Sequence, residues 1–563
     1  MNPSPDNALI VQSDSSVLLE VHAPRADEAR AALAPFAELV KSPEHVHTYR
    51  LTPLSIWNAR SMGMTAVAMV SALREHARYS IPENVVTEVE ELAARYGRVV
   101  ITKSSDAPDS LLCSCLDRTT AERLARDRAT GHYLADRLDA TRFRVHPSLR
   151  GVLKQALVSA GFPPEDLAGY VVGEHLDVAL RQTCLSGAPF GVREYQRMAA
   201  DAFYLSGSER GGSGVITLPC GAGKTIVGLA VMAAVGETTL ILCTSLTSVK
   251  QWRREILDKT TLPEAALAEY TGEHKATGPV TLSTYQVLTW RPDRGADFPH
   301  FALFSARPWG LIVYDEVHLL PAPVFRITAE LQARRRLGLT ATLVREDGRE
   351  SDVFALIGPK RYDVPWRELE QQAWIATAVC TEIRVPVPEA QRLEYALAER
   401  RAQFRIAAEN PAKTAHVRWL LDSHPDGKVL VIGEYLSQLE MLAHEIAAPL
   451  VTGKTPQMER ESLYDRFRRG ELRHLVLSKV GNFALDLPDA DVLIQVSGAF
   501  GSRQEEAQRL GRILRPKSDG RTARFYTLVS RDTREEDFAH HRQLFLTEQG
   551  YSYRVEIALE RIP

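Results

Sequence analysis

The sequence predicts an α/β protein with two lobes built on parallel β-sheets, preceded by two small α+β domains. From about residue 177 onward, short apolar runs alternate with stretches whose apolar residues recur at helical spacing. This alternation is typical of successive β–α–β units. The stretch 365–375 interrupts it, and we interpret that stretch as the connection between the two lobes. A length of 563 residues leaves room for three or four domains.

The composition is that of a soluble globular protein, with 45% hydrophobic and 25% charged residues. The net charge of −3 excludes a globally basic surface, so a nucleic-acid-binding surface would be a local groove. The polar N-terminus and the lack of any run of about 18 apolar residues argue against a signal peptide and a membrane span. Six scattered cysteines are no disulfide framework, so we expect a reducing, cytoplasmic compartment.

Residues 1–98 are predicted to form an accessory α+β domain. Apolar runs at 8–11 and 17–21 predict strands, and apolar residues at helical spacing predict helices over 26–39 and 85–96. This stretch has no catalytic constellation. An adaptor domain and a plain packing domain both remain open.

Residues 99–176 are predicted to form a second small domain. A strand is expected at 98–102, an Arg-rich helix over 117–138, and a further helix that begins near His146 and ends near Phe162. The Arg-rich helix either contacts a nucleic-acid backbone or, more commonly, forms a solvated face. Cys113-Ser-Cys115 lacks the second ligand pair of a zinc site, so buried thiols are expected there.

A glycine-rich turn at 214–225 follows a predicted strand and opens a predicted helix. Gly221 and Gly223 permit positive φ, which lets backbone N–H groups approach an anion at the positive end of the helix dipole. Lys224 can reach the β- and γ-phosphates of ATP, and the Thr225 hydroxyl can ligate Mg²⁺. An ordinary strand-to-helix turn is the alternative. The expected nucleotide contacts are Leu218, Pro219, Cys220, Gly221, Ala222, Gly223, Lys224 and Thr225.

Three residues just before the helix predicted at 197–204, upstream of the glycine-rich turn, are candidates for nucleotide recognition. The ring of Tyr195 and the amide of Gln196 suit adenine, and Arg193 belongs to the same segment. Taken alone, this signal is weak.

An acid pair ends the apolar strand that begins at Gly310. The Asp315 carboxylate suits Mg²⁺ shared with Thr225, and Glu316 is placed to orient the attacking water. Such pairs are common by chance, but one that lies about 90 residues after a phosphate-binding turn is not.

Hydroxyl residues end three further predicted strands. Thr244, Ser245 and Thr284 are candidates to hold the backbone phosphates of a bound strand. Capping of the next helix competes with this role for Ser245, and the two are compatible. Thr340-Ala-Thr342 ends another strand, where its hydroxyls could link the nucleotide site to a second lobe.

The second lobe begins with strands at 428–433, 475–478 and 492–496, after a charged helical stretch at 388–410. Its last predicted helix starts near Gly501 and places Gln508, Arg512 and Arg515 on one face. This alignment suits a clamp on the γ-phosphate from the opposite lobe. A salt-bridged surface helix is the alternative.

In this order the motifs resemble those of superfamily 2 helicases, in which ATP lies between two RecA-like lobes. More narrowly, residues 188–545 resemble the XPB family of DNA repair helicases. In this resemblance Leu218 stands where a strict phosphate-binding pattern has glycine. The carrying segments are Leu218 to Thr225, Arg345-Glu-Asp347, Ser478-Lys-Val-Gly481 with Asp486-Leu-Pro488, and Gln508 to Pro516.

The resemblance implies ATP hydrolysis that drives 3′→5′ movement on single-stranded or forked DNA and separates strands. It implies that Lys224 and Thr225 bind phosphate and Mg²⁺, and that Asp315 and Glu316 serve the metal and the attacking water. It also implies that Asp486 contacts the nucleotide. Gln508, Arg512 and Arg515 would be catalytic, the two arginines as fingers. Arg345, Glu346 and Asp347 match an element thought to help separate strands.

The resemblance also implies a domain plan and partners. The family pairs with a nuclease in some prokaryotes, although this chain carries no nuclease carboxylate cluster of its own. We expect a monomer. The plan is an accessory domain at 1–98, a damage-recognition-like module at 99–176, RecA-like lobes at 177–372 and 373–563, and a short thumb insertion at 386–412.

Three other functions stay open from the residues. A duplex DNA translocase that separates no strands would share all the ATPase motifs. An RNA-directed motor and a non-catalytic scaffold that binds ATP are the others, and the intact acid pair makes the scaffold the weakest.

Overall fold

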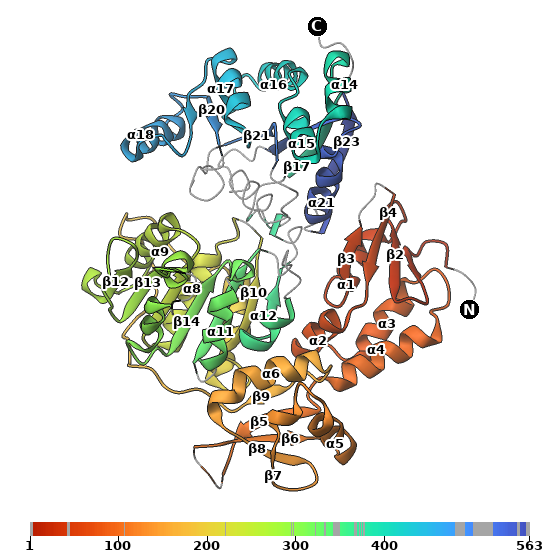
Figure 1. Ribbon diagram of the computed structural model, residues 1–563, viewed down its shortest axis with the longest axis vertical. Coiled ribbons are helices and arrows are strands. Elements are labelled where there is room, and N and C mark those ends of the chain that lie inside the picture. The colour runs from red at the N-terminus through yellow and green to blue at the C-terminus, as the bar shows by residue number, and fades with distance from the viewer. Residues whose placement is uncertain are drawn as a thin grey trace. The chain divides into compact units, whose positions relative to one another are not determined.

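The chain folds into two compact units, seen here in a computed structural model (Figure 1). The first comprises 1–218 with 223–363, and the second comprises 219–222 with 364–563. The structure describes residues 4–41, 45–105, 107, 109–219, 221–293, 296, 298–320, 322–331, 334–341, 350–364, 369–370, 372, 374, 378–478, 490–498, 522–548 and 552–558.

The first segment of unit one is an antiparallel sheet of order β1-β2-β4-β3 with four helices. Its core is closed by buried side chains such as Leu19, Phe36 and Val89. The elements are β1 (Leu9–Val11), β2 (Ser16–Glu20), α1 (Ala26–Leu33), β3 (Glu38–Lys41), β4 (Val46–Arg50), α2 (Pro53–Ser61), α3 (Ala66–His76) and α4 (Glu83–Arg95).

The next segment is a five-stranded mixed sheet of order β7-β8-β6-β5-β9 with two helices. Cys113 and Cys115 are buried on β6, which confirms the expectation of buried thiols, and burial raises the pKa of the Cys115 thiol to about 11. The elements are β5 (Val99–Lys103), β6 (Leu111–Cys115), α5 (Arg118–Arg126), β7 (Asp136–Arg137), β8 (Arg142–Val145), α6 (Arg150–Ser159) and β9 (Glu165–Leu167).

Two helices expected here from the sequence are wrong in extent. The helix predicted over 26–39 ends at Leu33, because Glu38–Lys41 pairs with β4 as a strand. The helix predicted over 117–138 ends at Arg126. The Asp127 carboxylate accepts the backbone N–H groups of Ala129 and Thr130 and turns the chain there.

A seven-stranded parallel sheet of order β12-β13-β11-β14-β15-β10-β16 completes unit one. Its central strand β14 is a hydrophobic run with no charged residue before Asp315, as expected for a parallel strand covered on both faces. The elements are α7 (Glu194–Tyr204), β10 (Ser213–Thr217), α8 (Lys224–Val235), β11 (Thr239–Cys243), α9 (Leu246–Lys259), β12 (Leu267–Tyr270), β13 (Val280–Thr284), α10 (Tyr285–Leu288), β14 (Leu311–Asp315), α11 (Ala322–Glu330), β15 (Arg335–Thr340), α12 (Glu350–Leu356) and β16 (Lys360–Asp363).

The accessory segments pack directly on this sheet domain. Helix α6 lies against α11 and α12, and Gln155 donates to Asp352 at 2.9 Å. Trp57 and Val158 from the accessory segments share one apolar core with residues of the large sheet. Unit one is therefore a single packed body.

Unit two is a second seven-stranded parallel sheet, of order β19-β20-β18-β21-β22-β17-β23. Two parallel-sheet lobes confirm the predicted α/β class. The helix pair α14–α15 occupies the charged stretch predicted to be helical. The elements are β17 (Ala378–Val385), α14 (Glu389–Leu397), α15 (Arg400–Ala408), α16 (Ala412–Asp422), β18 (Val429–Ile432), α17 (Leu436–Glu445), β19 (Leu450–Val451), α18 (Gln457–Arg468), β20 (His474–Leu477), β21 (Val492–Gln495), β22 (Ala523–Ser530), α21 (Glu535–Glu548) and β23 (Ser552–Ile557).

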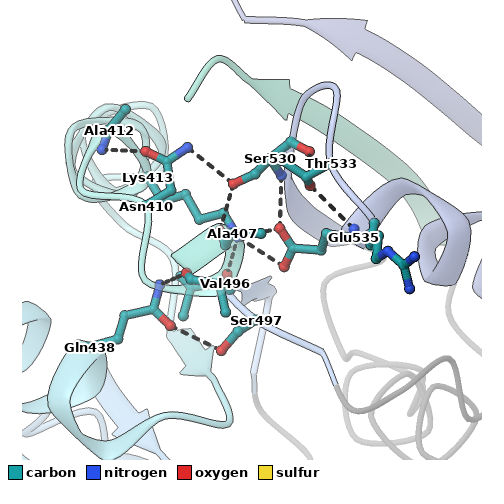
Figure 2. Close-up of polar contacts among 12 residues, drawn as sticks. Ala407, Asn410, Ala412, Lys413, Gln438, Val496, Ser497, Ser530, Thr533 and Glu535 are labelled. Carbon is teal, nitrogen blue, oxygen red and sulfur yellow. Dashed lines mark hydrogen bonds and ion pairs between the residues drawn. The ribbon is translucent and has the colours of Figure 1, made fainter. Parts of the chain in front are cut away.

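A buried ion pair joins the carboxyl ends of these strands to the helix pair. Lys413 Nζ lies 2.8 Å from Glu535 Oε2 and donates to the carbonyl oxygen of Val496, just past β21 (Figure 2). Glu535 also accepts the backbone N–H of Ser530, whose hydroxyl donates to the Ala407 carbonyl at the end of α15. The Lys413 and Glu535 side chains are 1% and 9% exposed, so each charge depends on the other.

Replacement of Lys413 by Met is expected to destabilise unit two by about 3–5 kcal/mol, because the Glu535 carboxylate would stay buried without its counter-charge. The double change Lys413→Met/Glu535→Leu should recover part of that loss, since it leaves no charge unpaired, although the Ser530 N–H and the Val496 carbonyl lose these partners. Urea unfolding of the full chain measures both.

The matched control is Arg418→Met, which breaks the exposed Arg418–Glu445 pair and should cost less than about 1 kcal/mol. A loss for Lys413→Met no larger than that of Arg418→Met would contradict the assigned role of the buried pair.

Candidate functional site

The predicted phosphate-binding turn leads from β10 into α8, and Gly223 caps the first turn of that helix. Gly221 and Gly223 have φ of +83° and +80°, a region that side chains disfavour, as the sequence predicts. A Cβ on Gly223 would lie 2.6 Å from Gln196 Nε2, so the turn and Gln196 approach each other as closely as a glycine allows. Lys224 and Thr225 open α8, where the first backbone N–H groups and the dipole of the helix favour an anion.

The upstream recognition candidates form one cluster beside this turn. Gln196 is 3% exposed, and its Oε1 accepts the backbone N–H of Arg193 at 3.0 Å. Arg193 Nη1 and Gln196 Nε2 both donate to the Tyr195 hydroxyl, at 3.2 and 3.4 Å. These hydrogen bonds cap the N-terminus of α7 and hold the Gln196 side chain against Gly223. Adenine recognition by Tyr195 and Gln196 and nucleotide binding by Arg193 stay predictions.

The acid pair lies at the carboxyl end of the central strand β14, as the sequence predicts. Lys224 Nζ contacts Glu316 Oε1 at 2.9 Å, so α8 and β14 meet through this ion pair. Glu316 has φ +50° and ψ +56°, a left-handed conformation that is rare for a residue with a side chain. Strain of this kind concentrates at functional sites, and here it turns the Glu316 carboxylate toward Lys224.

The two carboxyl groups differ in acidity although they are adjacent. Burial and the charge of Glu316 raise the pKa of Asp315 to about 6. Burial alone would raise the pKa of Glu316 too, but the charges of Lys224 and His318 bring it below its usual value. Glu316 is therefore ionised at neutral pH and can accept a proton. Two acids whose environments push their pKa values apart are suited to different roles.

Oxygen donors for Mg²⁺ are present at this edge. The Thr225 hydroxyl and the Asp315 carboxylate are hard ligands, and Mg²⁺ commonly binds through one or two such groups, waters and substrate phosphates. Within the described ranges no group of three or more His, Cys, Asp or Glu side chains forms an all-protein metal cage. This donor set fits a metal shared with a nucleotide.

The contacts of three residues around the acid pair were not predicted. Trp252 Nε1 donates to Asp315 Oδ2 at 3.0 Å, and the Tyr285 hydroxyl donates to the Asp315 carbonyl at 2.9 Å. His318 Nδ1 lies 2.5 Å from the Thr340 hydroxyl and 3.5 Å from Glu316 Oε2. The sequence Asp-Glu-Val-His at 315–318 indicates that His318 lies close to the acid pair. By contrast, nothing in the sequence near Trp252 indicates a contact with Asp315.

The hydroxyls expected to hold nucleic acid lie at the same edge of the sheet. Ser245 Oγ accepts the N–H of Ser248 and caps α9, which confirms the competing role raised for it. Thr284 Oγ1 caps α10 in the same way, and Thr244 lies 3.5 Å from the Ser248 hydroxyl. Their contact with nucleic acid stays a prediction.

Several predicted site residues lie outside the described residues, and they stay predictions. They are Cys220, Thr342, Arg345, Glu346, Asp347, Asp486, Gln508, Arg512 and Arg515.

Comparison with known proteins places these motifs in a family. The family model "ERCC3/RAD25/XPB C-terminal helicase" matches residues 369–562, the model "Type III restriction enzyme, res subunit" matches 189–345, and "Helicase conserved C-terminal domain" matches 9–139. The protein named DNA 3′-5′ helicase XPB of Mycobacterium tuberculosis is 53% identical over 98% of each chain. Its namesake in Kineococcus radiotolerans is 54% identical over 98% of this chain and 96% of that one.

A eukaryotic relative matches at lower identity. The Saccharomyces cerevisiae protein named general transcription and DNA repair factor IIH helicase/translocase subunit XPB/SSL2 is 31% identical, over 97% of this chain and 71% of that one. Identity above 50% across nearly the whole length, together with the family model over the second lobe, shows that this chain belongs to the XPB family of DNA helicases.

Proposed function

We propose that this ATP-dependent helicase hydrolyses ATP at the β10–α8 turn and uses the energy to move 3′→5′ along DNA and separate its strands in repair. The observation that carries the proposal is the Lys224–Glu316 ion pair, 2.9 Å long, with Asp315 beside it. It brings the phosphate-binding helix together with an acid pair that can serve the metal and the attacking water, which are the parts that phosphoryl transfer from a nucleotide uses.

In the proposed reaction Lys224 exchanges Glu316 for the β- and γ-phosphates of ATP, while the α8 N–H groups hold the same oxygens. Glu316, ionised at neutral pH, then orients water in line with the γ-phosphate and accepts its proton. Thr225 and Asp315 would hold Mg²⁺, which when bound neutralises charge on the phosphates.

The remaining roles follow the family. Gln508, Arg512 and Arg515 would complete the site from the second lobe, with Asp486 and the Arg193–Gln196 cluster also contacting the nucleotide. Thr244, Ser245 and Thr284 would hold DNA phosphates at the sheet edge, and Arg345, Glu346 and Asp347 would help part the strands.

We further propose the four-part plan of 1–98, 99–176, 177–372 and 373–563, with a short thumb at 386–412 that contains α14 and α15. A nuclease partner, a monomeric state and a cytoplasmic location belong to the same proposal. None of the helices in the described part of the chain is long and apolar enough to cross a membrane.

A duplex translocase is the second candidate, because the yeast relative is named a helicase/translocase subunit. Strand displacement on 3′-tailed, 5′-tailed and blunt DNA duplexes, with RNA duplexes alongside, separates the candidates. We expect displacement from the 3′ tail only. DNA-stimulated ATPase without displacement on any substrate would favour the translocase, and stimulation by RNA alone would favour an RNA motor.

Replacement of Lys224 by Ala is expected to lower DNA-stimulated ATP hydrolysis by about 100-fold or more, because the charge that faces the phosphates is removed. The matched control is Lys360→Ala, which breaks the Lys360–Asp363 pair on β16 of the same sheet and should leave hydrolysis unchanged. Equal rates for Lys224→Ala and the wild-type chain would rule out this turn as the hydrolytic site.

A further inference from the structure

The indole of Trp252 packs between Asp315 at the end of β14 and Gly228 on α8. Trp252 is on α9 and is 2% exposed, and its Nε1 donates to Asp315 Oδ2 at 3.0 Å. On its other side the ring contacts Gly228, where an added Cβ would come within 2.4 Å of the indole Cη2. Gly228 is one turn along α8 from Lys224 and Thr225. One side chain therefore touches both the phosphate-binding helix and the acid strand.

The contact with Asp315 constrains the carboxylate. An indole N–H can only donate, so it holds Oδ2 of Asp315, whose carboxylate also accepts the backbone N–H of Glu316. The Tyr285 hydroxyl fixes the main chain of the same residue by donating to its carbonyl. Side chain and backbone of Asp315 are thus both held by aromatic donors from neighbouring elements.

Ordinary packing does not require this arrangement. Trp309 is equally buried in the same sheet domain, and its Nε1 donates to the Leu303 carbonyl at 2.9 Å. A buried indole can thus be satisfied by a backbone carbonyl alone, without a carboxylate. The choice of Asp315 as the acceptor of Trp252 is what calls for a functional reason.

We infer that Trp252 is a positioning residue of the nucleotide site, which holds the Asp315 carboxylate in the orientation that Mg²⁺ bound with Thr225 and a nucleotide requires. The inference rests on the proposed function. Hydrogen-bond partners of metal ligands fix the ligand and typically change metal affinity about 10–100-fold when they are removed. Gly228 takes part, because it leaves the space that the indole occupies.

The test measures how strongly Mg²⁺ strengthens nucleotide binding, with no turnover. A fluorescent ADP analogue is titrated into the full chain with and without Mg²⁺, and the ratio of the two Kd values is compared between variants. Trp252→Phe keeps an aromatic ring but removes the N–H, so we expect the ratio to fall about tenfold while the Kd without Mg²⁺ is unchanged. Gly228→Ala should lower the ratio in the same direction, because it displaces the indole.

Trp309→Phe is the matched control, since it removes an equally buried indole N–H away from Asp315, and its ratio should equal the wild-type ratio. If the ratio of Kd values in Trp252→Phe equals the wild-type ratio, the inference is overturned while the proposed function stays intact. Should Trp252→Phe not fold, a ratio of Kd values in Gly228→Ala equal to the wild-type ratio would overturn the inference in the same way. A wild-type chain whose binding of ADP is not strengthened by Mg²⁺ would overturn the proposed function together with this inference.

Discussion

The site depends on the placement of two adjacent carboxylates at a sheet edge where solvent reaches them only in part. Asp315 and Glu316 repel each other, and burial raises the free energy of both charges. Lys224 and His318 resolve this conflict for Glu316, whose pKa falls, while Asp315 is left with a pKa near 6. A phosphate-bound cation next to Asp315 would complete the balance of charge.

This placement follows from the architecture of the parallel sheet. Strand β14 lies at its centre, so its carboxyl end meets the N-terminus of α8, the helix that follows β10. The left-handed backbone of Glu316 then turns one acid toward Lys224, and Asp315 remains in line with the strand and meets Trp252. The fold thus gives neighbouring residues of one chemical type two different environments.

The sequence was a good guide where the signal is local. An apolar run followed by Asp315-Glu316, and a glycine turn followed by Lys224, are fixed by short-range chemistry, and both are confirmed in place. The sequence was a poor guide where the structure depends on contacts between distant segments. Glu38–Lys41 continues a helical spacing but pairs with β4, and Trp252 reaches Asp315 across 63 positions. The roles expected for Gln508, Arg512 and Arg515 remain predictions from sequence.

Glu316 is proposed to activate water rather than bind nucleotide, and Glu316→Gln separates these two roles. The change keeps the size of the side chain but removes the proton acceptor. ATP binding and single-turnover hydrolysis are measured on the same sample with forked DNA. We expect ATP binding to be retained within about threefold while hydrolysis falls about 100-fold or more. Hydrolysis at the wild-type rate in Glu316→Gln would contradict it.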